Sequence, residues 1–502
     1  MTGDLILAID EGTSSARAIA YDADWHPVAT ATRRLTTDHP QPGWAEQDAE
    51  AIVVAVVEVV AEVLEAVRGP GRIAAAGLAN QGETVVAWDR HTGAALAPAV
   101  LWSCRRSQEI VERITADGHG AWIRERTGLP LDPYFSASKL RWLLEEVPTV
   151  ASAAESGRLA FGTVDAWVTA CLGTEIARTD PSTASRTQLF ALADLDWDDD
   201  LLGVWGIPST TLPMLVPTTG DLGSLAHPSW GGAIPLRAMV CDQQAALAGQ
   251  GGHRAATIKA TFGTGVFVLA NAGEAVPPPP DGILATVAWG SPGGPATYAL
   301  DGGVFSAGAF LAWLHDDIGL LDAPAMLDRL ASQVPDAGGA RMLPALAGLG
   351  APWWDADARV TISGLSAATR RPHLARAALD AIAQRTADIV EAMTPALPSA
   401  TVPLRVDGGL TGSDLLVDRL ADLVGRPVDV AADPESTALG TALLAAIGAG
   451  RLDEEAAAAV AGTKRRVEPR LGEAARRAER SAWIEFVHAA RALAPERLTR
   501  ST

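Results

Sequence analysis

The chain has 502 residues, which predicts more than one domain and most simply two large ones. Apolar residues make up 48% of the chain and charged residues 20%, so it can bury sizeable cores. The formal net charge of −20 argues against a broad surface for nucleic acid or anionic membranes, although loop amides and a few local cations can still bind phosphates.

The cysteines and histidines predict neither a disulfide framework nor a zinc site. Cys104, Cys171 and Cys241 are far apart and form no CxxC pair, which fits a reducing compartment. The nine histidines show no HExxH or comparable ligand spacing. The first ten residues lack the basic segment of a signal peptide, so we expect a soluble cytoplasmic protein.

Residues 6–22, ILAIDEGTSSARAIAYD, are two apolar runs joined by a polar corner, which predicts a strand, a turn and a second strand. Glycine lets a backbone approach an anion closely, and loop amides with hydroxyls can surround phosphate oxygens. A plain turn is the alternative explanation for any single corner of this kind. The polar residues of the corner are Asp10, Gly12, Thr13, Ser14, Ser15 and Arg17.

The most apolar segment, residues 51–67, predicts an amphipathic helix packed on a sheet. Glu58, Glu62 and Glu65 fall on one face at helical spacing, which argues against a membrane span. Short strand-like runs on both sides of this segment predict an α/β protein with a mixed sheet.

The glycine corner recurs about half a chain later. Residues 257–270, TIKATFGTGVFVLA, repeat the pattern, with Gly263 and Thr264 in the places of Gly12 and Thr13. This spacing predicts a protein built of two similar halves. A third corner, VDGGLTGSD, lies within residues 404–414, and no GxxxxGK[ST] motif of a P-loop occurs. The last fifty residues, rich in Ala, Arg and Glu, are predicted to be helical.

Together the three corners resemble those of the actin, hexokinase and heat-shock-70 ATPase superfamily. Residues 133–146 and 362–383 are similar to the two signatures of the FGGY family of carbohydrate kinases, with Val360 where a small residue is usual. Stretches such as PGWAEQDAEAI, CDQQAAL and GLGAPWWD are similar to the glycerol kinases of that family, in the same order, from about residue 5 to about residue 450. The resemblance implies two RNase H-like domains around a central cleft.

The resemblance also implies a division of labour between the halves. Residues 1–248 would hold the acceptor substrate, the catalytic acid and the first phosphate loop, and residues 249–502 would bind the nucleotide. The implied cofactors are ATP and Mg²⁺. The implied partner is a small polyol or sugar, with no nucleic acid and no membrane insertion. A homodimer or homotetramer would match relatives.

Asp242 matches the family's catalytic aspartate, which would take the proton from the acceptor hydroxyl. A helix N-cap is the alternative role for an acid at this junction. Asp10, with Asp242, is the expected partner of magnesium, mostly through water.

The resemblance places the ATP phosphates at the first two glycine corners. It places the rest of the nucleotide beside Gly308, Gly408 and Gly409. A solvated strand residue is the alternative reading of Arg17. Ala312 and Ser413 stand where Gln and Asn are common, so the adenine contacts are expected to differ. The implied ATP-binding residues are Gly12, Thr13, Ser14, Ser15, Arg17, Thr264, Gly265, Gly308, Gly408, Gly409 and Ser413.

The acceptor pocket departs from the family pattern at one position. Carboxylate, amide and phenol groups can bond an acceptor's hydroxyls, while aromatic faces cover its carbons. Glycerol kinases read Asn-Gln-Arg-Glu-Thr where residues 80–84 read NQGET, so the pocket arginine is replaced by Gly82. The residues at the implied acceptor positions are Gly82, Glu83, Trp102, Tyr134, Asp242, Gln243 and Phe267.

Glycine at position 82 is compatible with two alternative classes of acceptor. Losing a charged hydrogen bond would weaken binding by about tenfold to a hundredfold and would open space. Either another donor or water replaces the arginine and glycerol remains the acceptor, or the pocket takes a longer polyol or ketose such as erythritol, xylitol or xylulose. We rank glycerol first because the rest of the set is that of a glycerol site.

Two other classes of protein would fit a nucleotide-binding fold: a nucleotide switch and a kinase that has lost turnover. An actin-like nucleotide switch would need no acceptor pocket, and a kinase that had lost turnover would not keep Asp10, Thr13, Asp242 and Thr264. Residues 225–237 lack an arginine before Ile-Pro, so we expect no inhibition by fructose 1,6-bisphosphate.

Overall fold

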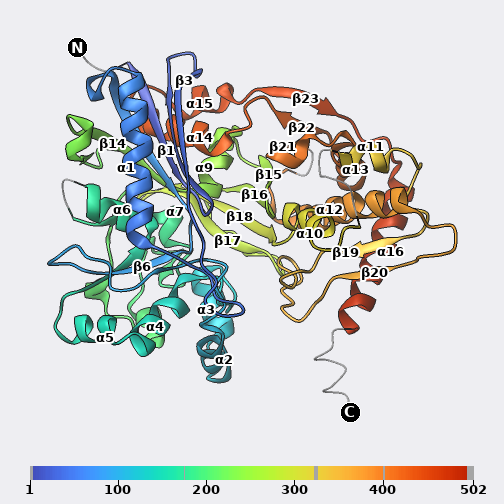
Figure 1. Ribbon diagram of the computed structural model, residues 1–502, viewed down its shortest axis with the longest axis horizontal. Helices are drawn as coiled ribbons and strands as arrows, with labels where there is room; N and C mark the ends of the chain where they lie inside the picture. Colours follow the sequence, from blue (N-terminus) through green and yellow to red (C-terminus); the bar gives the residue numbers. More distant parts are fainter. Residues whose placement is uncertain (1–3, 174–175, 321–325, 400–401, 494–502) are drawn as a thin grey trace.

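The computed structural model describes residues 4–173, 176–320, 326–399 and 402–493. Two large sheets dominate it, one formed by the N-terminal half and one by the C-terminal half (Figure 1). This arrangement confirms the predicted mixed α/β architecture.

The first large sheet has six strands in the order β13-β14-β5-β1-β2-β3. Strand β1 pairs antiparallel with β2 and parallel with β5, and β14 pairs parallel with β5. The carboxyl ends of β1, β5 and β14 therefore meet at one edge of the sheet. The strands are β1 (Leu5–Glu11), β2 (Ser15–Tyr21), β3 (Pro27–Arg34), β5 (Ile73–Asn80), β13 (Ser224–Leu225) and β14 (Ile234–Cys241).

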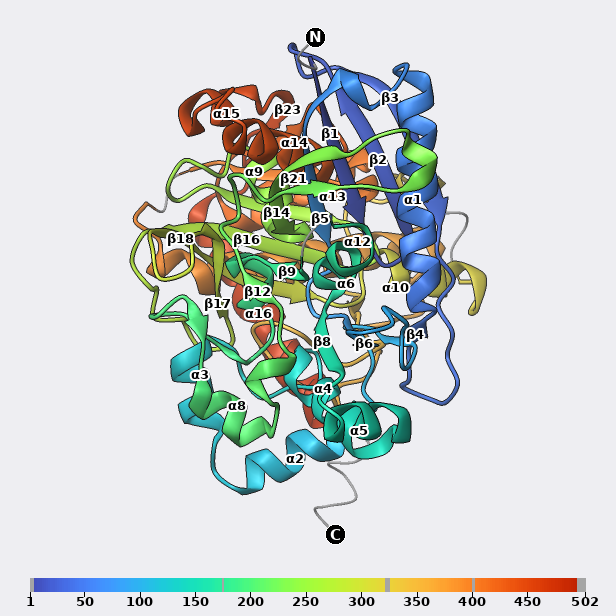
Figure 2. The ribbon, with the colours of Figure 1, turned by 90° about the vertical axis from the view of Figure 1, so that its left-hand side faces the viewer.

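Helix α1 (Ala49–Ala66) covers one face of this sheet, along β2 and β3 (Figures 1 and 2). Asp48 caps it by accepting hydrogen bonds from the amides of Glu50 and Ala51. Its apolar stripe is buried, while Glu58 and Glu62 are exposed and pair with Arg33. The amphipathic helix predicted for this segment is confirmed.

The second large sheet has seven strands in the order β17-β18-β16-β15-β21-β22-β23. Strands β15 and β16 form an antiparallel hairpin, and β15 pairs parallel with β21. Each sheet thus contains a hairpin whose first strand pairs in parallel with a later strand. This shared pattern agrees with the two similar halves that the repeated glycine corner predicts. The strands are β15 (Ile258–Phe262), β16 (Val266–Gly273), β17 (Leu284–Gly290), β18 (Ala296–Val304), β21 (Leu404–Asp407), β22 (Val428–Ala431) and β23 (Thr463–Val467).

Two helices that pack on each other lie between the sheets. The later one packs on β1, β5 and β14 of the first sheet, and the earlier one also contacts β15 and β16 of the second. Helices α9 (Asp242–Gly249) and α14 (Ser436–Gly448) share one apolar cluster with β1, β5, β14 and β16. The approach is close: a Cβ atom at Gly77 in β5 would lie 2.6 Å from the carbonyl oxygen of Thr441. On the second sheet, helices α12 (Arg371–Met393) and α13 (Asp414–Val424) form a further large core.

A small four-stranded sheet, in the order β4-β7-β6-β8, extends the N-terminal half. Several short helices pack beside it at the end farthest from the N-terminus (Figure 2). The remaining strands are β4 (Glu46–Gln47), β6 (Val85–Asp89), β7 (Ala99–Val100), β8 (Leu159–Thr163), β9 (Arg178–Thr179), β10 (Phe190–Ala191), β11 (Asp196–Trp197), β12 (Met214–Leu215), β19 (Arg341–Leu343) and β20 (Thr361–Ser363). The remaining α-helices are α2 (Gln108–Ala116), α3 (Gly120–Thr127), α4 (Ser136–Glu146), α5 (Pro148–Glu155), α6 (Val164–Leu172), α7 (Pro181–Ala184), α8 (Asp199–Trp205), α10 (Gly308–Asp316), α11 (Leu327–Ala331), α15 (Glu454–Val460) and α16 (Glu473–Ala492).

The all-helical prediction for the C-terminal segment is wrong in one place. Between α15 and α16, residues Thr463–Val467 form strand β23, which pairs antiparallel with β22 at the edge of the second sheet. An unpaired edge is a strong template for a further strand, and this outweighs the local composition. Among the residues that the structure describes, none of the helices has the length and apolarity to cross a bilayer.

Candidate active site

A cavity of about 300 Å³ lies between the two halves, at the edge where the parallel strands of the first sheet end. Its wall contains all the residues that the sequence assigned to the acceptor. It also contains Thr13 and Ser14 of the first hairpin and Thr264 and Gly265 of the second. The acceptor residues on the wall are Gly82, Glu83, Trp102, Tyr134, Asp242, Gln243 and Phe267.

Asp242 is the first residue of α9 and directly follows β14. Its Oδ1 accepts a hydrogen bond from the Gln243 amide at 2.6 Å, so it stabilises the helix start while facing the cavity. Burial raises the pKa of its carboxyl, while the charge of Lys259 and the Gln243 contacts oppose that rise. The carboxylate is therefore a stronger base than a solvated aspartate.

Asp10 is the penultimate residue of β1 and lies close enough to Asp242 for their charges to interact. Burial raises the pKa of Asp10 to about 7, the charge of Asp242 adds to the rise, and Arg17 opposes it. Magnesium typically uses one or two carboxylates together with water and phosphate oxygens. A pair of desolvated, mutually repelling carboxylates fits such a cation. The described residues contain no group of three or more His, Cys, Asp or Glu side chains suited to a metal ion.

Aromatic rings form much of the cavity wall. The ring of Trp102 meets those of Tyr134 and Phe267 edge-on, with centroids 5.6 and 6.2 Å away. Phe305, which the sequence did not indicate, stacks on Tyr134 at 5.8 Å. These faces can cover a short carbon chain, and Glu83 and Gln243 add polar groups to the same wall.

The Thr13 hydroxyl links the first glycine corner to the aromatic wall of the cavity. Trp102 Nε1 donates to Thr13 Oγ1 at 2.8 Å, and Thr13 Oγ1 donates to Gln81 Oε1 at 3.1 Å. A hydroxyl has one hydrogen to donate, so this one is directed at Gln81 rather than at a phosphate. The amide of Gly12 closes the hairpin by donating to the Ser15 carbonyl.

The space that Gly82 was expected to open is filled. A Cβ atom at this position would lie 2.7 Å from Cys241 Sγ and 3.5 Å from Arg186 Cγ. Real Cβ atoms almost never approach another heavy atom at 2.7 Å. The sequence-based expectation of extra volume is therefore corrected: Cys241 and the stem of Arg186 occupy it.

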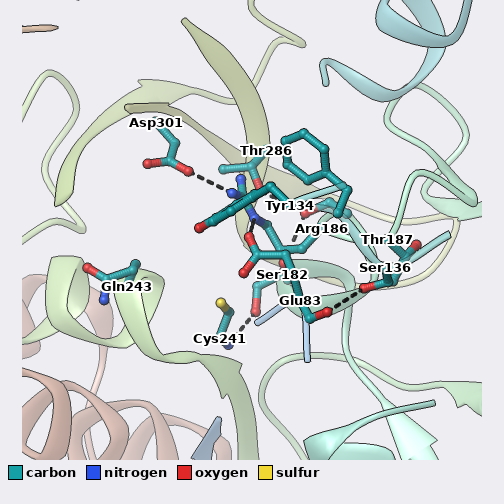
Figure 3. A network of polar contacts seen from close by, with 12 residues as sticks. Glu83, Tyr134, Ser136, Ser182, Arg186, Thr187, Cys241, Gln243, Thr286 and Asp301 are labelled. Carbon is teal, nitrogen blue, oxygen red and sulfur yellow. Dashed lines mark hydrogen bonds and ion pairs between the residues drawn. The ribbon is translucent and has the colours of Figure 1, made fainter. Parts of the chain in front are cut away.

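Arg186 is the main cavity residue that the sequence analysis missed. It is 2% exposed, and its guanidinium pairs with Glu83 and Asp301 at 2.7 and 2.9 Å (Figure 3). Burial alone would lower the pKa of Arg186, but the charges of Glu83 and Asp301 raise it well above its ordinary value. The residue lies in the stretch TDPSTASRTQLF, which is similar to glycerol kinases but carries no chemical signature of its own.

Arg186 is held by the short helix before it. Asp180 caps α7 by accepting from the amides of Ser182 and Thr183. Ser182 Oγ accepts from the Cys241 amide at 2.9 Å, and Thr183 Oγ1 donates to Asn80 Oδ1 at 3.2 Å. These bonds attach the segment to the ends of β14 and β5, beside the cavity.

Two of the predicted nucleotide glycines lie against the second corner. A Cβ atom at Gly308 would lie 2.6 Å from the Gly263 carbonyl oxygen. Gly408 has a φ of 90° and lies against the backbone of Phe262, so a side chain there would be strained. Gly409 follows in a short 3₁₀ helix, Gly409–Gly412.

The structure places Arg17 and Ser413 away from the cavity wall. Arg17 Nη1 pairs with the carboxylate of Glu435, immediately before α14. Ser413 caps α13 by accepting from the Leu416 amide, and its hydroxyl donates to Asp328. In this conformation both side chains are engaged with protein groups.

Comparison with known proteins identifies the family. The model of the FGGY family of carbohydrate kinases matches residues 5–249 with its N-terminal domain and residues 258–449 with its C-terminal domain. The chain belongs to the FGGY family of carbohydrate kinases. The protein is thus an ATP-dependent kinase of a small carbohydrate or polyol, as the resemblance of its motifs implied.

Relatives of this FGGY kinase include several glycerol kinases. That of Citrifermentans bemidjiense is 44% identical over 486 residues, which are 96% of this chain and 98% of the relative. That of Alkalilimnicola ehrlichii is 46% identical over 443 residues, 88% of this chain and 89% of the relative. The crystal structure of Plasmodium falciparum glycerol kinase with ADP is similar at a TM-score of 0.89 and 28% identity, covering 97% of this chain and 98% of that chain.

Proposed function

We propose that the protein transfers the γ-phosphoryl group of ATP to a terminal hydroxyl of glycerol, giving glycerol 3-phosphate and ADP. One observation carries the proposal: a single cavity unites the carboxylate of Asp242, the predicted hydroxyl-binding residues and the two glycine corners. The names of relatives 44% and 46% identical to this chain support glycerol as the acceptor.

In the proposed reaction, Asp242 accepts the proton of the acceptor hydroxyl while that oxygen forms its bond to the γ-phosphorus. The bond from the γ-phosphorus to the bridging oxygen of ADP breaks as the new bond forms. Glu83, Tyr134 and Gln243 would orient the hydroxyls, and Trp102 would cover the carbons. Positioning supplies much of the rate enhancement, because phosphoryl transfer requires alignment of the attacking and leaving oxygens.

The glycine corners are the proposed phosphate sites. Thr13, Ser14 and Ser15 would surround the terminal phosphates from the first half, and Thr264 and Gly265 from the second. Asp10 and Asp242 would hold Mg²⁺, which when bound neutralises phosphate charge. On this proposal residues 1–248 bind the acceptor and residues 249–502 bind the nucleotide, with Phe267 completing the acceptor wall from the second half.

A longer polyol or a ketose is the competing acceptor. That alternative depended on open space beside Gly82, where Cys241 Sγ and Arg186 now lie. A nucleotide switch is the competing class of protein, but a switch needs no acceptor cavity, and the chain belongs to a kinase family. Glycerol phosphorylation therefore accounts for more of the observed site.

The test is coupled ADP release with Mg·ATP across glycerol, erythritol, xylitol, dihydroxyacetone and xylulose. We expect glycerol to give the highest kcat/KM. A longer acceptor that gives a higher kcat/KM overturns glycerol but leaves a polyol or sugar kinase. ADP release that does not depend on any acceptor overturns the kinase function.

The free cysteines bear on the compartment in which the protein works. We propose a cytoplasmic enzyme, because Cys104, Cys171 and Cys241 are unpaired, as expected in a reducing compartment. A homodimer or homotetramer is the proposed assembly, and light scattering during gel filtration would measure it.

A further inference from the structure

Glu83, Arg186 and Asp301 form a buried charge cluster that joins the two halves at the cavity (Figure 3). Arg186 Nε donates to Glu83 Oε1 at 2.7 Å, and its Nη2 lies 2.9 Å from Asp301 Oδ2. Glu83 follows β5 of the first sheet, whereas Asp301 belongs to β18 of the second. The guanidinium thus spans the interface directly beside the acceptor residues.

Two polar atoms of this cluster lack a protein partner. Arg186 Nη1 and Asp301 Oδ1 are buried and make no hydrogen bond to any described residue. Arg186 is 2% and Asp301 6% exposed, and both line the cavity. A buried donor or acceptor that stays unpaired is costly, so native structures usually provide a partner. A hydroxyl can accept from the arginine and donate to the aspartate.

Position 82 contributes no competing donor. Gly82 has no side chain, and Cys241 Sγ closes the space beside it. Among the described residues that line the cavity, Arg186 is the one cation. The guanidinium of Arg186 also packs against an aromatic ring, since its central carbon lies 5.7 Å from the centre of the Phe135 ring.

We propose that Arg186 binds the acceptor directly, donating from Nη1 to a hydroxyl that is not phosphorylated, while Asp301 Oδ1 accepts from a hydroxyl of the same molecule. This inference rests on the proposed function, because it assigns a role toward the acceptor of that reaction. Arg186 and Asp301 then determine specificity for hydroxyls away from the reacting end. The cationic donor missing at Gly82 comes from a different element, the turn after α7.

The first test is the variant Arg186→Lys, compared with the wild type on three acceptors. Lysine keeps the positive charge between Glu83 and Asp301, but it replaces five donors on three nitrogens of a planar fork by three donors on one nitrogen. A single ammonium cannot occupy the separate positions of Nε, Nη1 and Nη2. We expect the KM for glycerol to rise by about tenfold to a hundredfold, with the KM for ATP unchanged. Of 1,2-propanediol and 1,3-propanediol, the diol lacking the contacted hydroxyl should show no such rise. An equal rise for all three acceptors, or an unchanged glycerol KM, overturns the proposal.

Arg385→Lys is the matched control, because Arg385 is a fully buried arginine that pairs with Asp388, away from the cavity. If the melting curve shows that Arg186→Lys does not fold, the variant Asp301→Asn tests the proposal in its place. The amide oxygen of the introduced asparagine should face Arg186 Nη2, which leaves an NH2 donor in the place of the Oδ1 acceptor. This change should raise the KM for glycerol and spare the diol that lacks the contacted hydroxyl. An unchanged glycerol KM in Asp301→Asn overturns the proposal.

The acceptor panel separates failure of this inference from failure of the proposed function. If the wild type prefers a longer polyol, glycerol is lost as substrate, and the Arg186→Lys comparison uses that polyol and its deoxy analogues. A selective KM effect there supports Arg186 as an acceptor-binding residue, and a uniform effect overturns it.

Discussion

At the scale of single residues, Asp242 is the group on which the proposed mechanism depends most. We expect Asp242→Asn to lower kcat by at least ~10²-fold, because the acceptor hydroxyl loses its general base. Asparagine keeps the shape of the side chain and can still accept from the Gln243 amide, so folding should survive. Steady-state ADP release measures kcat, and fluorescence titration with an ATP analogue measures nucleotide binding, which should be nearly intact.

The control for this variant is Asp221→Asn. Asp221 is an exposed acid paired with Arg237, and it does not line the cavity. Near-wild-type turnover in Asp242→Asn would remove Asp242 from the proposed mechanism, whereas a loss in both variants would indicate a general effect on the fold.

Gly82 and Cys241 should behave as a coupled pair. Gly82→Ala places a methyl group 2.7 Å from Cys241 Sγ, and overpacking of this kind typically costs about 1–3 kcal/mol. Adding Cys241→Gly removes the clash, so the double variant should recover much of the lost stability. Melting temperatures of the single and double variants give the coupling free energy. Additive effects would show that the backbone relaxes independently of Cys241.

The limits of sequence-based prediction are clearest at this scale. The acceptor set, Asp242 among it, was predicted because each residue matches a position in a family motif. The replacement of one arginine by Gly82 was also visible, but its structural consequence was not. Cys241 and Arg186 are distant from Gly82 in sequence, and the fold alone brings their side chains against it.

At the scale of elements, the hairpin of β1 and β2 is joined to the acceptor wall through Trp102. We expect Trp102→Phe to keep an aromatic wall but lose the 2.8 Å bond to Thr13 Oγ1. A net hydrogen bond is worth about 0.5–1.5 kcal/mol, so the KM for the acceptor and the KM for ATP should both rise by about twofold to tenfold. Initial-rate measurements with each substrate varied in turn check this.

Trp122→Phe is the control, because that indole packs by His119 and does not line the cavity. A rise confined to the acceptor KM would mean that Trp102 acts as a wall alone and does not position the phosphate corner.

Long elements with a clear pattern were predicted, and short ones were not. Helix α1 and the hairpins around Thr13 and Thr264 have periodic apolar residues and turn glycines that define them locally. Two-residue strands such as β9 and β12 exist because they pair with each other. Strand β23 likewise forms by pairing with β22, and local sequence does not encode that partner.

At the scale of the whole molecule, we expect His253 to make the free energy of unfolding depend on pH. Its ring packs against that of Trp289 at a tilt of 43°, with centroids 4.6 Å apart. Burial lowers the pKa of His253 from 6.5 to about 4. Between these values the unfolded chain binds a proton that the folded protein does not, so stability falls as pH falls from 6.5 towards 4. The slope from this residue is about 1.4 kcal/mol per pH unit.

His253→Gln removes this titration, so the melting temperature of the variant should fall less than that of the wild type between pH 7 and pH 5. Melting curves in matched buffers at the two pH values measure the difference. Equal falls in both proteins would show that other groups dominate the acid response.

The apolar layer between the sheets determines whether the two halves can exist separately. Helix α14 follows the last parallel strand of the second sheet, but it packs on α9 and on β1, β5 and β14 of the first. Close backbone approach at Gly77 leaves no room for a substitute side chain or for a loosely docked helix. A fragment of residues 1–248 would therefore expose the apolar face that α14 covers, and a fragment of residues 249–502 would expose α14 itself.

We expect each fragment alone to aggregate or to melt without a cooperative transition, and co-expression of the two to restore a soluble complex with kinase activity. Circular dichroism melting and gel filtration of the separate and co-expressed fragments test this. Two fragments that each fold cooperatively would show that the functional boundary proposed at residues 248 and 249 is also a folding boundary, whereas loss of folding in both places the folding unit at the level of the whole chain.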